Sequence, residues 1–147
     1  MNTSIATLLA GKGRALHTVP TTVTVTEAVQ KMNQHRIGAV LVLEGERLAG
    51  IFTERDVLTR VIAASLDPKV TSITKAMSAN VLTIAPEATV QEVMDIFAEK
   101  RCRHLPVIEH GKLTGLISIG DVSRWVANAH RAEAESLRSY IAGDIST

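Results

Sequence analysis

The chain is poor in several residue types that whole classes of function require. Aromatic residues make up 3% of its 147 residues, so the stacking platforms that bind RNA or single-stranded DNA are not expected. A single cysteine, Cys102, excludes an internal disulfide and a metal site built from several cysteines, and it favours a reducing compartment. The 16 Lys and Arg residues against 15 Asp and Glu leave a net charge of +1, too small for a strong field toward nucleic acid.

Long hydrophobic runs are also missing. No apolar segment reaches the roughly 18–20 residues that a membrane-spanning helix needs, so no membrane partner is expected. The first 15 residues do not show the charged, apolar and small-residue order of a signal peptide, and the sequence therefore predicts a cytoplasmic protein. With 46% hydrophobic and 21% charged residues, the chain is expected to form one ordinary domain or two small fused units.

The sequence contains an internal repeat. Residues 18–61 align without a gap with residues 83–126, a shift of 65 positions, and 12 of the 44 aligned pairs are identical. The identical pairs include Thr24/Thr89, Glu27/Glu92, Gly50/Gly115 and Asp56/Asp121. Two copies are too few for a solenoid, and one small unit rarely buries its own apolar face. We therefore predict two units paired about a pseudo-twofold axis.

Each unit is predicted to run strand, helix, strand, strand, helix. The spacing of Thr24 and Glu27, repeated in the second unit, is that of a capping box at a helix start. Apolar residues follow at helical spacing. They are Val25, Ala28, Val29 and Met32 in the first unit and Val90, Val93, Met94 and Phe97 in the second.

A β-hairpin is predicted after each of these helices, with a second helix beginning at Asp56 or Asp121. The hairpin strands are expected at 39–43 and 48–53, and at 105–108 and 113–118.

The two ends of the chain are expected to lie outside the repeat. Residues 4–10 are predicted as a short helix ended by Gly11 and Gly13, and residues 122–142 as a long helix ended by Gly143. On the long helix, Leu137, Tyr140 and Ile141 form an apolar stripe. This stripe is interpreted as core or as a dimer contact rather than as part of a ligand site.

A hydroxyl and a carboxylate recur where each hairpin leads into its helix. They are Thr53 with Asp56 and Ser118 with Asp121. The structural interpretation is a helix cap, which Asp, Ser and Thr all favour. The functional interpretation is a nucleotide site, because helix-start N–H groups attract phosphate and a carboxylate can accept from both hydroxyls of a ribose diol. Recurrence at the same register strengthens the functional interpretation until the two are about equal, and both stay open.

A basic segment, residues 100–106, opens the first hairpin strand of the second unit. It is either a solvated run of charge or the mouth of a cleft, in which Arg103 and His104 would suit an oligophosphate. At the matching place in the first unit, Gly38 and Ala39 are small and would let a flat base approach the backbone.

These motifs resemble a tandem pair of cystathionine-β-synthase (CBS) motifs, the arrangement called a Bateman module. The resemblance covers about residues 3–126 and is carried by Gly-apolar-x-Ser/Thr-x-x-Asp in both halves and by Arg-His-Leu-Pro-Val at 103–107. The chain is similar to small stand-alone bacterial proteins made of little else. The resemblance implies an α/β (α+β) fold of two β-α-β-β-α motifs with flanking helices, the first motif within 1–67 and the second within 68–147.

The resemblance also implies two clefts for adenosine-containing ligands such as AMP, ATP or NAD(H). One cleft would be formed by His17, Thr18, Gly38 and Ala39 with Ser118 and Asp121. The other would be formed by Leu82, Thr83, Cys102 and Arg103 with Thr53, Arg55 and Asp56, and His104 would reach phosphate together with Arg103. Ile37, Leu105 and Pro106 complete the expected ligand-binding residues. Gly38 and Ala39 lack the basic pair found at Arg103 and His104, and Gly120 replaces Arg55. The Asp56 cleft is therefore expected to favour the more highly phosphorylated ligand or the pyrophosphate of a dinucleotide.

No catalytic constellation is apparent, so the sequence does not predict an enzyme. Cys102 is better interpreted as a small cleft-lining residue than as a nucleophile beside His104, and the five histidines lack metal-ligand spacing. We expect a homodimeric sensor without a catalytic cofactor, which passes a ligand-dependent shape change to an unidentified regulated protein. The alternatives are a ligand-indifferent scaffold that docks on a partner and an RNA binder, which the low aromatic content disfavours.

Overall fold

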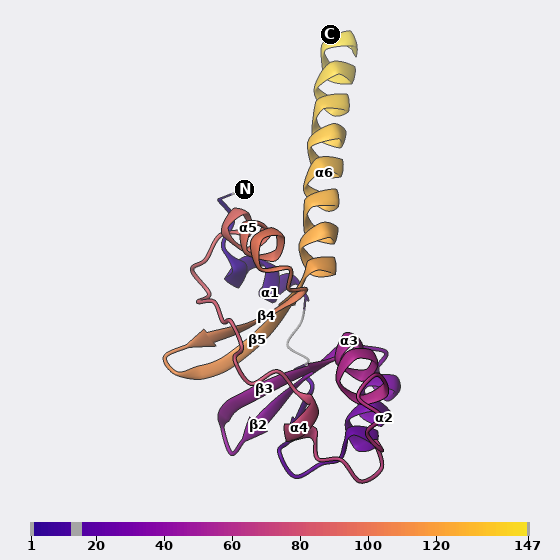
Figure 1. Cartoon of the computed structure of the whole chain (residues 1–147). Coiled ribbons are helices and arrows are strands. Elements are labelled where there is room, and N and C mark those ends of the chain that lie inside the picture. Colours follow the sequence, from indigo (N-terminus) through magenta and orange to yellow (C-terminus); the bar gives the residue numbers. More distant parts are fainter. Residues whose placement is uncertain (1, 13–15, 147) are drawn as a thin grey trace. The chain divides into compact units, whose positions relative to one another are not determined.

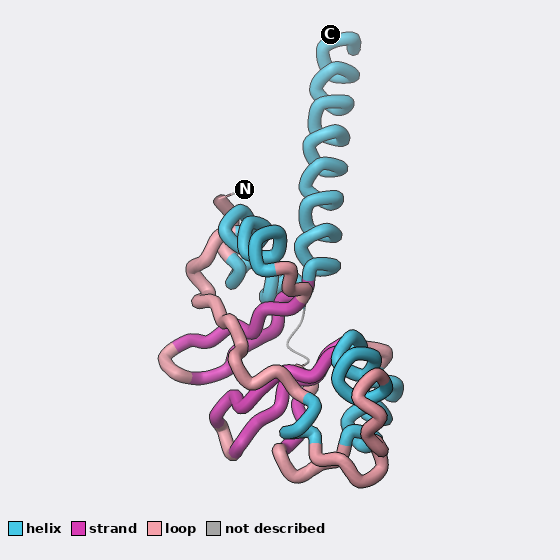
Figure 2. The backbone as a smooth tube through the Cα atoms, in the orientation of Figure 1, coloured by secondary structure: helices cyan, strands magenta, loops and turns pink. Residues whose placement is uncertain are grey.

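The structure, a computed structural model, describes residues 2–12 and 16–146 and divides into two compact units. Of the described residues, one unit contains 2–12, 87–104 and 117–146, and the other contains 16–86 and 105–116. Each unit therefore combines segments that are distant in the sequence (Figures 1 and 2). The boundary between the two sequence motifs, expected between residues 67 and 68, is a different division from these compact units, and it stays a prediction.

A three-stranded sheet forms the centre of the larger unit. Its strands are β1 (Thr18–Pro20), β2 (Ala39–Glu44) and β3 (Arg47–Thr53), in the order β1-β2-β3. Strand β1 runs parallel to β2, and β3 runs antiparallel to it, so that Ala39 lies opposite Thr53. Gly45, with φ of +63°, forms the turn between β2 and β3. The predicted hairpin is confirmed to within one residue at each end.

Helix α2 (Val25–His35) begins at the predicted capping box. The Thr24 side chain accepts from the N–H of Glu27, and the Glu27 carboxylate accepts from the N–H of Thr24. The apolar face buries Val25, Ala28 and Met32, as predicted. These residues share a core with buried side chains of the sheet and of the following helices, namely Val19, Val40, Val42, Phe52, Val61, Ile73 and Ala76.

Two short helical segments follow the sheet. Helix α3 (Glu54–Asp56) continues into the π-helical segment η1 (Val57–Ile62), which buries Val61 and leaves Leu58 and Ile62 exposed. Helix α4 (Ile73–Ala76) covers the core, and its last residue is followed by Met77 and Ser78, which lie against β3.

The second half of the repeat contains α5 (Val90–Lys100), β4 (His104–Glu109) and β5 (Lys112–Ser118). Helix α5 has the predicted capping box at Thr89 and buries Val90, Val93 and Phe97. The strand expected before it is reduced to a single bridge between Ile84 and Val107.

Proline explains why this strand is short. In the first half, the N–H of Leu41 donates to the carbonyl of His17 and extends the pairing of β1 with β2. The residue that matches Leu41 in the repeat is Pro106, which has no N–H to donate. Ile84 still exchanges backbone hydrogen bonds with its neighbours on β4, at 3.0 Å to the Pro106 carbonyl and 2.9 Å from the Ile108 N–H.

Both terminal helices are longer than predicted. Helix α1 (Ile5–Lys12) continues through Gly11, and Gly13 lies outside the described residues. Helix α6 (Ile119–Ser146) begins earlier than residue 122 and continues through Gly143. A glycine inside a helix costs only about 1 kcal/mol relative to alanine, and it ends the helix only when the backbone turns left-handed there.

Helix α1 belongs to the repeat, contrary to the prediction that the ends lie outside it. The triplet Thr-Ser-Ile occurs at 3–5 and again at 71–73, a shift of 68 rather than 65. The N–H of Val90 donates to the carbonyl of Thr3, as the N–H of Val25 donates to that of Thr71. Ser4 bridges Thr89 as Ser72 bridges Thr24. Helix α1 therefore packs beside α5 as α4 packs beside α2.

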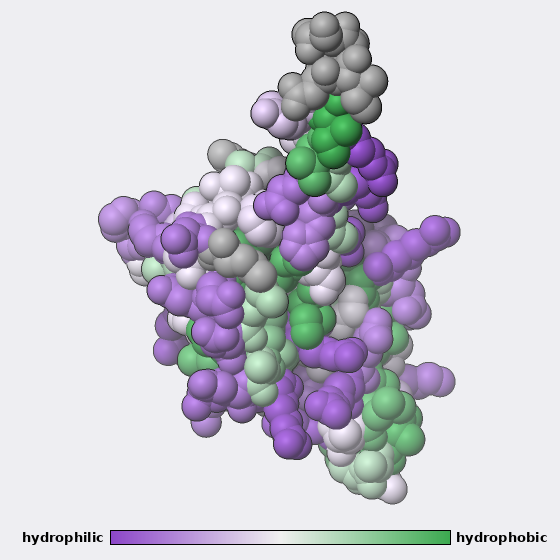
Figure 3. All heavy atoms as spheres, turned by 90° about the horizontal axis from the view of Figure 1, so that it is seen from above, coloured by the Kyte–Doolittle hydropathy of each residue, from purple (hydrophilic) through white to green (hydrophobic). Residues whose placement is uncertain are grey.

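The apolar stripe on α6 is exposed. Leu137, Tyr140 and Ile141 are 61%, 68% and 50% accessible, so the interpretation of this stripe as core is wrong and the dimer interpretation remains. Figure 3 shows apolar surface next to the grey end of the chain on this helix. Among the described residues, no helix is both long and apolar enough to cross a bilayer.

Candidate functional site

The first hydroxyl–carboxylate pair lies at the end of β3. The Oδ2 atom of Asp56 accepts from the backbone N–H of Thr53 at 2.9 Å and from the Thr53 hydroxyl at 3.1 Å. In return, the Thr53 oxygen accepts from the N–H of Asp56 at 3.3 Å. Asp56 is only 8% exposed, so its carboxylate is held in place and largely shielded from water.

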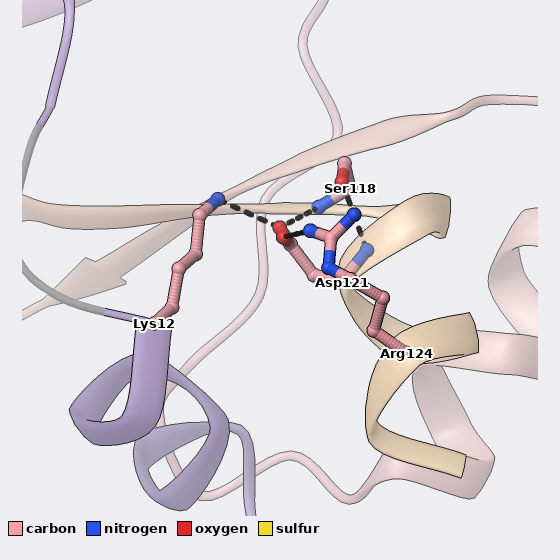
Figure 4. Close-up of polar contacts among 4 residues, drawn as sticks. All are labelled: Lys12, Ser118, Asp121 and Arg124. Atoms are coloured by element: carbon pink, nitrogen blue, oxygen red, sulfur yellow. Dashed lines mark hydrogen bonds and ion pairs between the residues drawn. The ribbon is translucent and has the colours of Figure 1, made fainter. Parts of the chain in front are cut away.

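The second pair repeats this arrangement at the end of β5. Oδ2 of Asp121 accepts from the N–H of Ser118 at 2.8 Å, and the Ser118 oxygen accepts from the N–H of Asp121 at 3.1 Å (Figure 4). Asp121 is also 8% exposed. Two buried carboxylates therefore occupy matching positions, one in each unit, and neither side chain points away into solvent.

The position of each carboxylate in its helix differs from the prediction. The sequence led us to expect helices that begin at Asp56 and Asp121, whereas α3 begins at Glu54 and α6 at Ile119. Thr53 is the N-cap residue and Asp56 is the third helical residue of a reciprocal capping box. The extended backbone at Thr53 puts its oxygen within reach of the N–H three residues later, so the hydroxyl and the carboxylate each satisfy one free helix-start donor.

The two carboxylates differ in the cations beside them. Asp121 has Lys12 at 2.6 Å from Oδ2 and Arg124 at 2.5 Å from Oδ1. The only cation recorded within ion-pair distance of Asp56, among the residues the structure covers, is Arg60 at 3.4 Å from Oδ1. Arg60 also donates to the carbonyl of Met77. Asp121 is therefore much the more strongly neutralised of the two.

The surroundings of Asp121 shift its acidity. Burial alone raises the pKa of this carboxyl group, but the hydrogen bonds from Lys12 and Ser118, together with the positive charge of Lys12, outweigh burial. The net result is a pKa below the ordinary value of 3.8. Asp121 is therefore a charged hydrogen-bond acceptor throughout the physiological pH range.

The small residues at the start of β2 lie beside an acidic side chain that the prediction missed. A Cβ on Gly38 would stand 3.0 Å from Oε1 of Glu54, so the space above this glycine is lined by a carboxylate. The N–H of Glu54 donates to the carbonyl of Gly38, and the N–H of Ile119 donates in the same way to that of Arg103. Ala39 is buried in the sheet, and Ile37 packs against the core.

The predicted residues near β1 make contacts of their own. The rings of His17 and His35 stack with centroids 4.1 Å apart. The ammonium of Lys31 donates to the carbonyl of Thr18. The sequence analysis did not assign His35 or Lys31 to the site. The two residues are four positions apart on α2 and therefore lie on the same face of that helix.

The predicted residues around the basic segment differ widely in exposure. Leu82, Thr83, Arg55 and Arg103 are exposed, and His104 is half-buried. Leu105 and Pro106 lie on β4, and both are buried in the protein interior. Cys102 is half-buried, and burial raises the pKa of its thiol, which makes it a poor nucleophile.

The two expected clefts combine residues of different units, and their assembly stays a prediction. Within each unit, the structure brings Thr53 to Asp56 and Ser118 to Asp121. The sequence analysis missed the cations beside these pairs. Arg60 and Arg124 follow their carboxylates at the i+4 and i+3 spacing of a helical ion pair, a signal that could have revealed them. Lys12 is 109 residues from Asp121 and gives no such local signal.

Among the residues that the structure describes, no group of three or more His, Cys, Asp or Glu side chains is placed to hold a metal ion. The site chemistry therefore consists of carboxylates, hydroxyls and basic side chains, which together can bind a polar ligand that carries hydroxyl donors.

Two repeated α+β units, each with a buried carboxylate after its hairpin, define the class of protein, and comparison with known families identifies it. The profile of the CBS domain matches residues 13–63 and 70–128. The chain therefore belongs to the CBS domain family and contains a tandem pair of these domains. Proteins of this family are generally regulatory modules rather than catalysts.

Solved structures confirm the fold. A putative signal-transduction protein with CBS domains from Burkholderia ambifaria is 39% identical, with a TM-score of 0.81, and the match covers 84% of this chain and 93% of that one. Hypoxic Response Protein I, with two coordinated zinc ions, is 28% identical, with a TM-score of 0.72 over 83% and 98% of the two chains. A CBS domain protein from Pyrobaculum aerophilum complexed with AMP shares the fold at 23% identity, with a TM-score of 0.72 over 80% and 88%.

Proposed function

We propose that this protein is a non-catalytic sensor that binds adenosine-containing ligands such as AMP, ATP or NAD(H). The observation that carries the proposal is the repetition of one buried hydroxyl–carboxylate pair, Thr53 with Asp56 and Ser118 with Asp121. A single such pair is a helix cap. The same pair at matching positions of both units, after the same hairpin, supports a shared binding role in addition to capping.

The chemistry of the carboxylate supports the sugar as the group that is recognised. An ionised carboxylate is an acceptor with about four lone-pair positions, and a ribose presents two neighbouring hydroxyl donors. At Asp56, the cap uses Oδ2, while the one cation beside Oδ1 within the described part of the chain is Arg60, at 3.4 Å. Acceptor capacity therefore remains for a diol, and partial burial strengthens each charge-assisted hydrogen bond.

Relatives supply support of a more general kind. A protein of the same fold from Pyrobaculum aerophilum holds AMP, which supports the idea that this fold can accommodate an adenylate. Hypoxic Response Protein I instead holds zinc. Among the described residues of the present chain, no three His, Cys, Asp or Glu side chains are placed to hold a metal ion, so zinc is not part of this proposal.

Signalling would follow from differential affinity. A ligand shifts a conformational equilibrium only to the extent that it binds one state more tightly than the other. We propose that occupancy of the Asp56 and Asp121 sites changes the population of conformations and that a regulated protein recognises the change. The basic residues Arg55 and Arg103 are exposed and available to phosphate, so the Asp56 site is proposed to favour the more highly phosphorylated ligand.

A second candidate function is a scaffold that docks on a partner without a ligand. It is favoured by large exposed apolar side chains on two helices, Leu58 and Ile62 on η1 and Leu137 and Tyr140 on α6. Apolar surface of this kind is typical of interaction sites. Within the sensor proposal the exposed residues on α6 support a homodimer, so the two candidates differ in the ligand rather than in whether the chain has an interaction surface.

A thermal-shift screen separates the two candidates. The intact protein is heated with adenosine, AMP, ATP, NADH or S-adenosylmethionine across a concentration series. A ligand at 100 times its dissociation constant stabilises the folded state by about 2.7 kcal/mol, a shift of several degrees for a chain of this size. A shift with the adenylates supports the sensor. No shift with any of the five compounds contradicts it and favours the scaffold.

A further inference from the structure

The ammonium of Lys12 is the contact that most clearly distinguishes the two carboxylate sites. Its Nζ lies 2.6 Å from Oδ2 of Asp121, and Figure 4 shows it reaching this atom from the end of α1. The Lys12 side chain is 34% exposed and that of Asp121 is 7% exposed, so the pair is partly shielded from solvent. Partly buried pairs of this kind are weakened by water and salt less than surface pairs are.

Lys12 reaches Asp121 because α1 is longer than its counterpart in the other unit. Helix α4 starts in the same way, with the same triplet and the same backbone hydrogen bond, but it ends at Ala76. Helix α1 continues to Lys12. The position that matches Lys12, at a shift of 68, is Asn80, which carries no charge. The repeat therefore places an ammonium at one carboxylate and has no cation at the corresponding position for the other.

The acceptor positions of Asp121 are correspondingly occupied. Oδ2 accepts from Ser118 and from Lys12, and Oδ1 accepts from Arg124. Arg124 is on the same helix as Asp121 and its side chain is 70% exposed, so it can swing into solvent without any change to the fold. Lys12 belongs to a different helix, anchored by the buried side chains of Ile5 and Leu8, and it remains close to the carboxylate.

We propose that Lys12 is a specificity-determining residue that competes with ribose hydroxyls for Asp121, so that a ribose ligand binds more weakly at Asp121 than at Asp56. This inference rests on the proposed function, because it assumes that the carboxylates bind a sugar. A neutral diol gains two hydrogen bonds at Asp121 but must displace an ammonium that already satisfies the carboxylate. At Asp56, among the described residues, the one cation that the same diol meets is Arg60, whose Nε lies 3.4 Å from Oδ1.

The test uses adenosine, which carries the ribose diol and no phosphate that could give Lys12 a new partner. Binding is measured by calorimetry on full-length protein with Asp56→Asn, a background that leaves Asp121 as the intact site. Lys12→Met removes the ammonium and keeps the apolar stem. The matched control is Lys75→Met, which changes an exposed lysine in the last turn of α4, the counterpart of α1 in the other unit, and lies outside the proposed sites. A second ligand, 2′-deoxyadenosine, lacks one of the two hydroxyls.

Lys12→Met is expected to tighten adenosine binding about tenfold, the size of one charge-assisted hydrogen bond. Lys75→Met is expected to bind adenosine with the affinity of the parent protein. The gain is expected to be smaller for 2′-deoxyadenosine. In an Asp121→Asn background, Lys12→Met is expected to change nothing, because the carboxylate that Lys12 occupies is gone.

Failure of the inference and failure of the proposed function give different results. Adenosine that binds Lys12→Met with unchanged or lower affinity overturns the role of Lys12 and leaves the sensor intact. A protein that binds neither adenosine nor ATP in any variant, while its unfolding curve stays cooperative, overturns the proposed function together with this inference.

Discussion

Met77 and Gly50 approach each other so closely that no larger residue fits at position 50. A Cβ on Gly50 would stand 2.5 Å from Sδ of Met77 and 2.7 Å from the carbonyl oxygen of Ser78. Ser78 exchanges two backbone hydrogen bonds with Ile51, at 3.0 and 2.9 Å, and so cannot move away. The glycine at position 50 is thus explained by contact of the segment after α4 with the edge of β3.

Gly50→Ala is expected to destabilise the protein by about 1–3 kcal/mol, the usual cost of overpacking, because the Ser78 carbonyl is held by the bridge. Gly11→Ala is the control, since a Cβ there meets nothing within 4 Å and lies in a helix. It is expected to stabilise by roughly 0.5–1 kcal/mol. Urea unfolding measures both. Equal urea midpoints for Gly50→Ala and Gly11→Ala would show that Met77 and Ser78 leave room for a larger residue at position 50.

Asp56→Ala and Asp121→Ala are each expected to weaken adenylate binding at their own site by about 1.5–3 kcal/mol through loss of a charge-assisted hydrogen bond. Both substitutions also remove a capping group, which lowers stability. Glu27→Ala and Glu92→Ala are matched controls, because each removes the same third-position carboxylate from a capping box with no proposed ligand. Calorimetry should show weaker adenylate binding only for the two aspartate variants. An equal loss of affinity in all four variants would show that the aspartates act only as helix caps.

The stability of the protein is expected to depend on pH through Asp121. Its folded pKa lies below the unfolded value, so the carboxylate adds stability above about pH 4, and this stability is lost as the pH falls through the folded pKa. Lys12→Met is expected to cost about 0.5–1 kcal/mol at pH 7, since the pair is partly exposed. The difference from the native protein should shrink below about pH 4. Unfolding curves between pH 2.5 and 7 test this, and a gap independent of pH would exclude the ion pair as its source.

The exposed stripe on α6 is expected to form a contact between two copies. Light scattering on the native protein should give about twice the chain mass of 15.8 kDa. Leu137→Lys should shift the equilibrium toward the monomer by placing a charge in an apolar contact. Ile62→Lys is the control on η1, where the native side chain is equally exposed, at 61% in both cases. A monomer at high concentration contradicts the dimer, and a monomer produced only by Ile62→Lys moves the contact to η1.

The elements that the sequence predicts correctly are those whose signals are local. The capping boxes at Thr24 and Thr89 and the apolar spacing behind them identify α2 and α5, because both devices act within two helical turns. The two β-hairpins are also predicted correctly, because the polar turns between their strands are local signals. Helix ends at glycine were predicted wrongly, because a glycine permits a left-handed cap without imposing one.

The repeat of Thr53 with Asp56 and Ser118 with Asp121 was also readable, and only the exact helix position of the carboxylates was missed. The short strand around Ile84 was not foreseen, although Pro106 carries the reason in the sequence. Pro106 shortens this strand only because the segment around Ile84 pairs with β4, where the proline N–H is missing. Pairing between segments so far apart in the sequence is decided by the fold.

Local chemistry thus sets the caps, the hairpins and the two acidic positions, since each involves residues at most a few places apart. The folded chain alone shows that α1 packs beside α5 rather than beside the repeat it precedes, and that Lys12 meets Asp121 across 109 residues. Such contacts arise because an amphipathic helix is buried wherever a complementary core is open to it, and sequence distance carries no information about where that core lies.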